Sequence, residues 1–338
     1  MPAKTDIVRL AHLHFPGIIK FSRASHIQDN LVRKLLTFKK DNDKYKNEVR
    51  ELLKNAGYSV SPQGLLQSAP NNPETISPKI QVTSEVNGNG RRAPRAPQPP
   101  DPIIFTFSPT GVYTTGRRDY PDPDAAPPSD KLKAEDLPEP LKPVSALLTS
   151  NPPLVQWHPT PRGGQTTYHG PGQLVAYTIL DLQRLGIGPR QHIRLLEETV
   201  IEVLRGYGIN GMVTDDPGVW VERPRPTPSS PEGNAGTADI KVGLPRKICA
   251  VGVHLRRYVS SYGIGLNVTE EPMFFFRQIA ACGLEGREAT SIEGEGVPGL
   301  SLDAVADRFA ESFMNVYNEK FATDTRIKEV YKMPMGSF

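Results

Sequence analysis

The stretch RGGQTTYHGPGQ, from Arg162 to Gln173, holds four glycines, one proline and one histidine in twelve residues, directly before the apolar run LVAYTILDL (Leu174–Leu182). Glycines at this density indicate a backbone that approaches another group closely or adopts angles that other residues avoid. The stretch has neither the GxxxxGK[ST] spacing of a phosphate loop nor a GxGxxG that opens a helix. Two interpretations remain from the pattern alone: a slot for an extended ligand, with Tyr168 and His169 at its rim, and a tight β-connection.

The segments around this stretch alternate between two periodicities. Apolar runs and alternation predict strands at 103–107, 112–115, 174–182, 248–255 and 264–268, the first two around a turn at 108–111. Apolar positions at helical spacing predict one helix behind Ser25 as N-cap, one from Pro189 and one behind Ser301 or Asp303. Paired strands together with helices favour an α+β fold with a mixed β-sheet flanked by helices.

Proline-rich tracts interrupt these ordered segments at 59–102, 121–150 and 223–245. The first contains few large apolar residues, so burial cannot offset its ordering entropy and we predict disorder. The stretch Pro121–Pro143 has the same composition and the same prediction. Because the ordered pieces are too short to fold alone, we expect the three tracts to be insertions in a single catalytic domain that covers 1–338.

The composition excludes several classes of protein. The 338 residues carry a formal net charge of +3, which gives no argument for a nucleic-acid partner. No apolar run reaches the roughly 20 residues of a membrane span, so no membrane partner is expected. The first residues, MPAKTDIVRLAHLHF, match a secretory signal poorly and a transit peptide weakly.

The two cysteines, Cys249 and Cys282, rule out a disulfide scaffold and are judged separately. Cys282 precedes a glycine in ACGLEG, where a thiol is accessible to a reactive carbonyl, whereas Cys249 lies inside an apolar strand, where it is a small buried hydrophobe. A nucleophilic thiol needs a neighbour that favours its thiolate, and His169 and Lys247 are candidates. No cysteine and histidine have zinc-like spacing, so no metal is expected.

The residues now point to a family. RGGQTTYHGPGQ resembles the signature of the lipoyl (octanoyl) transferases, which have the biotin/lipoate protein ligase fold. The resemblance continues, in the order of the family, through PGVWVE (Pro217–Glu222), KICAVGVHLRRYVSSYGIGLNV (Lys247–Val268) and ACGLEGREATSI (Ala281–Ile292). IIFTFSPTGVYTTGRR resembles the early hairpin of that family. These blocks cover most of the chain outside the proline-rich tracts.

The resemblance implies the residues of the site. Cys282 and Lys247 match the catalytic dyad of the family. The acyl slot of the family matches Arg162, Gly163, Gly164, Gln165, Thr166, Thr167, Tyr168, His169, Ala250, Val251, Gly252, Gly263, Ile264 and Gly265. Two departures touch this region: Thr178 replaces a common proline, and Tyr262 stands where many members carry a histidine that faces the substrate.

The resemblance also implies a reaction. An octanoyl chain passes from acyl carrier protein to the cysteine as a thioester, and then to one lysine of a lipoyl domain, such as that of a 2-oxoacid dehydrogenase E2 subunit or the glycine cleavage H protein. The reaction needs no cofactor, and eukaryotic members work in the mitochondrial matrix.

Two alternatives remain open. One is an ATP-dependent lipoate or biotin protein ligase of the same fold. The other is a non-catalytic protein that binds acyl groups or lipoyl domains, with Arg117, Arg118, Arg256 and Arg257 facing acidic partners.

Overall fold

The computed structural model describes residues 6–55, 59–60, 66–67, 96–125, 132–222, 244–279 and 288–336. Contacts divide the chain into two compact units, residues 1–32 with 101–338 and residues 33–100. The second unit contains most of helix α1 (Phe21–Asn55) and the short paired strands β2 (Ser59–Val60) and β3 (Leu66–Gln67). The remainder of the 59–102 tract up to residue 95, and residues 223–243 of the third tract, lie outside the described residues. The single-domain organisation stays a prediction.

An eight-stranded sheet forms the centre of the larger unit, in the order β13-β1-β4-β8-β12-β11-β10-β9. Strand β1 pairs in parallel with β13 and β4. In the rest of the sheet, β4, β8, β12, β11, β10 and β9 follow one another and each pair of neighbours is antiparallel. The strands span β1 (Asp6–Ile19), β4 (Ile103–Pro109), β8 (Gln173–Ile179), β9 (Gly211–Met212), β10 (Val219–Val221), β11 (Arg246–Arg256), β12 (Val259–Asn267) and β13 (Thr325–Lys332). The predicted α+β fold with a mixed sheet flanked by helices is confirmed.

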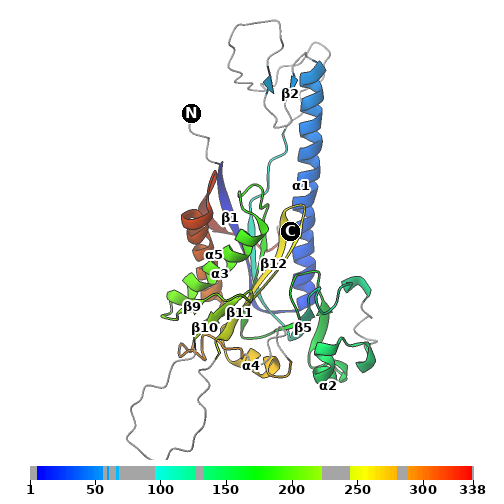
Figure 1. Cartoon of the computed structure of the whole chain (residues 1–338), viewed down its shortest axis with the longest axis vertical. Helices are drawn as coiled ribbons and strands as arrows, with labels where there is room; N and C mark the ends of the chain where they lie inside the picture. The colour runs from blue at the N-terminus through cyan, green and yellow to red at the C-terminus, as the bar shows by residue number, and fades with distance from the viewer. Residues whose placement is uncertain are drawn as a thin grey trace, which may run out of the picture. The chain divides into compact units, whose positions relative to one another are not determined.

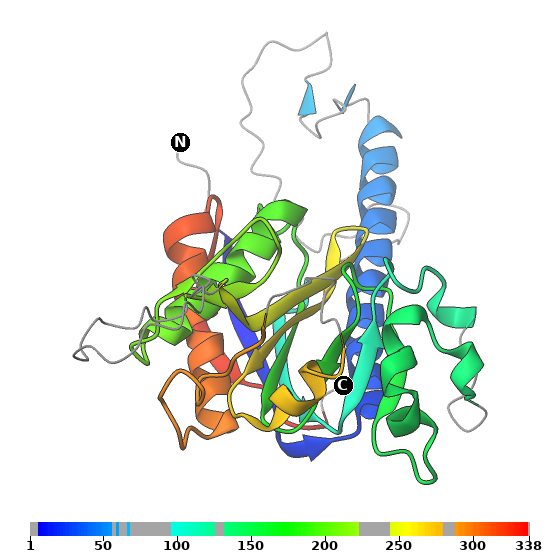
Figure 2. The same cartoon turned by 60° about the horizontal axis from the view of Figure 1, so that its bottom comes forward.

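Two amphipathic helices cover one face of this sheet, α3 (Pro189–Arg205) and α5 (Leu302–Val316), which lie side by side in Figures 1 and 2. Their apolar stripes, which include Leu196, Val200 and Phe309, enter the main core. Pro189 begins α3 as predicted, and the Ser301 hydroxyl caps α5 by accepting a hydrogen bond from the Ala304 N–H at 3.1 Å.

Helix α1 begins at Phe21, so the prediction of Ser25 as its N-cap was wrong. The Lys20 carbonyl already accepts hydrogen bonds from the N–H groups of Arg23 and Ala24, which closes the first turn before Ser25. Ile27, Leu31 and Leu35 are buried at the predicted helical spacing. The apolar period was therefore informative, whereas the position of the helix start was set by backbone bonds that side chains do not reveal.

The expected hairpin of residues 103–107 and 112–115 does not form, although both strands exist. Strand β5 (Val112–Thr115) belongs to a separate three-stranded sheet with β6 (Gln156–Pro159) and β7 (Thr167–His169). Strand β4 cannot pair with β5 because β1 and β8 already occupy its two edges. The connection between β4 and β5 thus carries the chain from one sheet to the other.

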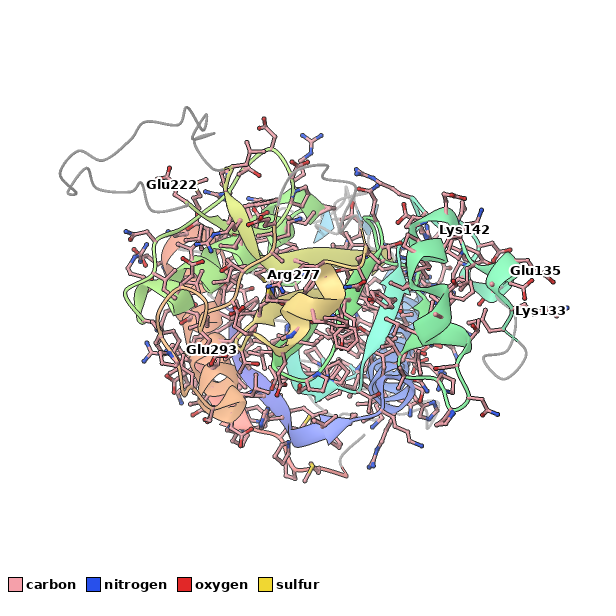
Figure 3. The ribbon with its side chains drawn as sticks, turned by 90° about the horizontal axis from the view of Figure 1, so that it is seen from below. Lys133, Glu135, Lys142, Glu222, Arg277 and Glu293 are labelled. Carbon is pink, nitrogen blue, oxygen red and sulfur yellow. The ribbon has the colours of Figure 1, made fainter. Side chains whose placement is uncertain are left out.

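Part of the second proline-rich tract is folded, which corrects the prediction of disorder for residues 132–143. It forms the short helices η3 (Ala134–Asp136), η4 (Glu139–Val144) and α2 (Ser145–Thr149), after η1 (Pro123–Ala125). Its sparse apolar residues, Leu137, Leu141, Val144 and Leu148, are buried against a cluster around Tyr113 and Tyr168. Its charged residues, such as Lys133, Glu135 and Lys142, lie at the outer edge of the molecule in Figure 3.

Short elements complete the described chain. Helix α4 (Glu271–Phe276) lies close to the glycine-rich stretch and packs Met273 and Phe276 into the cluster around Tyr168, and the π-helix η6 (Tyr317–Phe321) follows α5. Across the described residues, no helix has both the length and the hydropathy that crossing a bilayer requires.

Candidate active site

The glycine-rich stretch, β11 and β12 surround a cavity of about 260 Å³. Residues from segments more than 80 positions apart in the chain meet here. Of the residues predicted for the site, the cavity is lined by Arg162, Gly163, Gly164, Gln165, Thr167, His169, Lys247, Ala250, Val251, Gly252, Gly263, Ile264 and Gly265.

Two residues of the predicted acyl slot, Thr166 and Tyr168, do not line this cavity. The Thr166 N–H and hydroxyl both donate to the Asp119 carboxylate, at 2.5 and 2.6 Å. Tyr168 stacks on Phe275 with ring centroids 4.4 Å apart. Successive side chains of a strand point to opposite faces, so Thr167 and His169 face the cavity while Tyr168 between them packs into the cluster around Tyr113.

Seven further residues line the cavity that were not predicted for the acyl slot. These are Arg118, Tyr177, Ile193, Asp216, Pro217, Val253 and Tyr262. Tyr262 was singled out only as a departure from the family pattern, and Pro217 only as part of the PGVWVE block. Tyr177 lies opposite Gly263 in the pairing of β8 with β12, so the alternation of β8 places its side chain on the face of the predicted glycines.

Tyr262 adopts a left-handed backbone conformation, with φ of 62°, which is rare for a residue with a side chain. Its N–H donates to Gln28 Oε1 at 2.6 Å, so α1 holds this backbone in place. Its ring lies edge-on to Tyr177 with centroids 5.2 Å apart. Burial raises the pKa of the Tyr262 phenol to about 12, so this wall of the cavity is uncharged at neutral pH.

The glycines of the opening stretch approach other backbone. A Cβ on Gly116 would collide with the Gly164 carbonyl, and a Cβ on Gly252 would lie 3.2 Å from the Gly163 carbonyl oxygen. The Gly163 N–H donates to the Val253 carbonyl at 3.0 Å, and Gly164 has a φ of 88°. The stretch can therefore lie flat against β11 only because these positions lack side chains.

Arg162 fixes the fold of the same stretch from within. Arg162 is 7% exposed, and its guanidinium donates to the carbonyls of Gly163 and Gln165, at 3.1 and 2.9 Å. It also donates to the Thr114 carbonyl and hydroxyl, both at 2.8 Å. Arg162 thus ties the stretch to β5 and leaves a positive charge beside the cavity.

A chain of buried amides determines which nitrogen of His169 carries the proton. Asn267 Nδ2 donates to the Thr290 carbonyl at 2.9 Å, so Asn267 Oδ1 must accept the bond from Gln173 Nε2 at 2.8 Å. Gln173 Oε1 is then the acceptor that faces His169 Nδ1 at 2.6 Å. Nδ1 is therefore protonated and Nε2 is the acceptor nitrogen of the ring.

His169 stays neutral at physiological pH. Burial, reinforced by the charge of Arg162, lowers the pKa of its imidazole to about 4. A base with this pKa is poorly matched to proton transfer near neutrality. We therefore assign His169 to the cavity wall, where Phe21 stacks parallel to it.

Lys247 lies at the start of β11, at the end of the cavity lined by Asp216 and Pro217. Its ammonium donates to the Pro217 carbonyl at 3.2 Å and lies 4.5 Å from the centre of the Trp220 ring. Its backbone is paired with residues 288–290: the Lys247 N–H donates to the Glu288 carbonyl, and the Thr290 N–H donates to the Lys247 carbonyl. The motif that contains Cys282 is thereby continuous with a segment bound to Lys247.

The structure tests the prediction for only one of the two cysteines, Cys249. Cys282 lies in 280–287, outside the described residues, so its distance to Lys247 stays a prediction. Cys249 is fully buried in the main core, as predicted, and burial raises the pKa of its thiol. Within the described ranges, no cluster of three or more histidine, cysteine or acidic side chains is arranged to hold a metal ion.

Comparison with known proteins places the chain among lipoylation enzymes. Residues 144–314 match the lipoyl protein ligase A/B catalytic domain. A probable octanoyltransferase of Schizosaccharomyces pombe is 34% identical over 207 residues, which cover 61% of this chain and 74% of the relative. An octanoyltransferase of Jannaschia sp. is 41% identical over 160 residues, 46% of this chain and 68% of the relative. The bipartite lipoate protein ligase of Thermoplasma acidophilum has a TM-score of 0.44 and 13% identity, over 96% of this chain and 88% of that one.

Proposed function

Because this chain belongs to the lipoyl protein ligase A/B catalytic family, we propose that it transfers an octanoyl group from acyl carrier protein to the lysine of a lipoyl domain, through a thioester on Cys282. The observation that carries the proposal is the placement of Lys247 at a cavity walled by the glycine-rich stretch, with its backbone bound to Glu288, six residues after Cys282 (288 − 282).

The first half of the reaction exchanges one thioester for another. The Cys282 thiolate attacks the carbonyl carbon of the octanoyl thioester, a new C–S bond forms, and the C–S bond to the carrier breaks. The carrier leaves as a thiolate and takes the proton of the Lys247 ammonium, which leaves Lys247 as a neutral amine. The Lys247 ammonium favours the Cys282 thiolate by its charge.

The second half forms an amide. The ε-amine of the acceptor lysine attacks the Cys282 thioester, and the Cys282 thiolate leaves. Lys247, as a neutral amine in this step, accepts the proton that the attacking amine loses. Backbone N–H groups are the source of donors for the tetrahedral oxyanion. The thioester supplies the driving force, so the proposal includes no ATP.

The shape of the cavity suits an extended acyl chain. Gly252, Gly263 and Gly265 line it without side chains of their own, and Arg162 and His169 approach Gly252 and Gly265 closely. Tyr177, Ile193 and Ala250 contribute apolar surface to its lining. Polar side chains, among them Gln165 and Lys247, complete the lining, and apolar surface combined with placed polar groups is the usual form of a small-molecule site.

The acceptors proposed are lipoyl-domain proteins, such as 2-oxoacid dehydrogenase E2 subunits and the glycine cleavage H protein. The relative from fission yeast shows that the family has eukaryotic members, and for a eukaryotic source we propose the mitochondrial matrix.

Intact-protein mass spectrometry tests the proposal. The chain is mixed with octanoyl–acyl carrier protein without ATP, and peptide mapping locates any added mass. We expect an octanoyl adduct on Cys282 that hydroxylamine removes. Cys282→Ala should abolish the adduct, whereas Cys249→Ala, the matched control, should keep it because Cys249 is buried.

The other outcomes identify the alternatives. Lipoyl-domain modification that requires ATP, with no adduct on Cys282, would establish a ligase. Tight binding of the donor or of a lipoyl domain, with no transfer in either case, would indicate a binding protein. An equal loss of adduct in the two cysteine variants would refute the assignment of the nucleophile.

A further inference from the structure

Helix α3 places a carboxylate, that of Glu197, in the protein interior next to the Lys247 site. Glu197 is only 7% exposed, and the reaction described above does not use it. Burial raises the pKa of its carboxyl, while the Gly218 N–H and the charges of Arg194 and Lys247 oppose this shift. A carboxylate is costly to bury without partners, so its partners indicate what it does.

Glu197 and Lys247 bind the two ends of one peptide group. The Gly218 N–H donates to Glu197 Oε1 at 3.0 Å. The carbonyl of the same peptide bond, that of Pro217, accepts from Lys247 Nζ at 3.2 Å. Hydrogen bonds in a chain polarise one another, so an anion at the N–H end makes the carbonyl a stronger acceptor for the ammonium.

The position of this peptide leaves no room for a side chain. Gly218 has a φ of 130°, and a Cβ on it would lie 2.6 Å from the Cys249 carbonyl oxygen and 3.2 Å from Lys247 Cε. The ring of Trp220, two residues later, lies 4.5 Å from the Lys247 ammonium. The peptide and the ring therefore confine the ammonium together.

We propose that Glu197 is the positioning residue of Lys247, holding the Pro217–Gly218 peptide so that its carbonyl fixes the ammonium at the end of the acyl cavity. The inference rests on the proposed function, because the position of Lys247 matters only if Lys247 acts on Cys282. Glu197 affects the reaction indirectly: it holds the Pro217–Gly218 peptide, and that peptide holds Lys247.

Other charged and titratable groups surround this pair. Arg194, one turn earlier on α3, has its Nη1 3.9 Å from Glu197 Oε2. Asp216 lines the cavity beside Lys247, and Cys249 lies on β11. Glu198 is the next residue of α3 but binds Arg194 and Lys320, at 2.7 and 3.0 Å, which makes it a matched control on the same helix.

The test compares wild type with E197L, E197Q and E198Q. Two quantities are measured: the single-turnover rate of Cys282 acylation by octanoyl–acyl carrier protein, and the pH midpoint of Cys282 alkylation by iodoacetamide. The midpoint reports how strongly the ammonium favours the thiolate, and loss of stability alone would not move it. Circular dichroism establishes that each variant is folded.

We expect E197L to acylate about tenfold more slowly and to raise the alkylation midpoint by about half a pH unit or more. E197Q keeps an acceptor oxygen but loses the charge, so its behaviour should lie between that of wild type and that of E197L. We expect it to acylate about threefold more slowly than wild type, with a smaller rise in the alkylation midpoint than E197L shows. E198Q should match wild type in both quantities.

An E197L variant that matches E198Q in both rate and midpoint would overturn the proposal. Should E197L not fold, E197Q decides the question, and its equality with E198Q in both quantities would overturn it. A wild-type chain that forms no adduct refutes the proposed function itself, so the two failures are distinguishable.

Discussion

At the scale of single residues, the site depends on buried amides with a determined orientation. The Thr290 carbonyl can only accept, and this one constraint passes through Asn267 and Gln173 to the imidazole of His169. Asn267 is 3% exposed and Gln173 is fully buried, so water cannot replace a lost partner. The network also connects the glycine-rich stretch to the segment that pairs with Lys247.

Asn267→Asp should therefore destabilise the fold by about 3 kcal/mol at pH 7. It places a carboxylate oxygen, in place of the Nδ2 donor, opposite the Thr290 carbonyl at 2.9 Å. Urea unfolding measures the loss. Asn47→Asp, at an exposed position where Oδ1 already accepts from Arg50, is the control and should change the unfolding free energy by less than about 0.5 kcal/mol. Equal stability of the two variants would show that the amide orientations are not as described.

At the scale of elements, strand β1 occupies an interior position in the eight-stranded sheet. Residues 6–19 form β1, which is paired on both edges, with β4 and β13. Val8, Leu10 and Leu13 are buried on this strand. In the fold this segment is an interior strand of the sheet that supports the site.

Leu10→Ala should lower the unfolding free energy by about 2–4 kcal/mol, because it removes a fully buried side chain from the main core. Ile7→Ala on the same strand is the control, since Ile7 is 64% exposed, and its effect should stay below about 1 kcal/mol. Thermal and urea unfolding measure both variants. A neutral Leu10→Ala would mean that β1 is not part of the folded unit.

At the scale of the whole molecule, burial of histidines makes stability depend on pH. Burial lowers the pKa of His169 and of His192 from 6.5 to about 4, and that of His12 to about 3. Below pH 6.5 the unfolded chain binds protons on these side chains that the folded chain does not. The unfolding free energy should therefore fall as the pH falls from about 6.5 toward 4.

His192→Leu isolates this effect away from the acyl cavity. Its unfolding free energy should depend less steeply on pH than that of wild type, by about 1.4 kcal/mol per pH unit between pH 6 and 4.5, because one proton is no longer taken up on unfolding. Urea unfolding at a series of pH values measures the slope. His26→Leu, at an exposed position, should keep the wild-type slope. A wild-type slope in His192→Leu would contradict the assignment.

Several features of the fold follow from local patterns. The α3 start at Pro189, the α5 cap at Ser301 and the burial of Cys249 depend on neighbours within a few residues, so periodicity and capping rules predicted them. Disorder in 132–143 was predicted wrongly because its apolar residues are sparse, and only a distant cluster makes their burial possible. The β4–β5 hairpin was predicted wrongly because pairing depends on which edges other strands occupy.

The sequence alone determined the mixed α+β fold, through its alternating periodicities, and the family, through contiguous blocks; the resemblance of those blocks implied the glycines and the lysine that line the cavity. Only the tertiary structure decided that Tyr168 packs into the cluster around Tyr113 and that Glu197 and Lys247 bind one peptide group. Those contacts join residues 21 or more positions apart, and no local period encodes which face of one element meets which face of another.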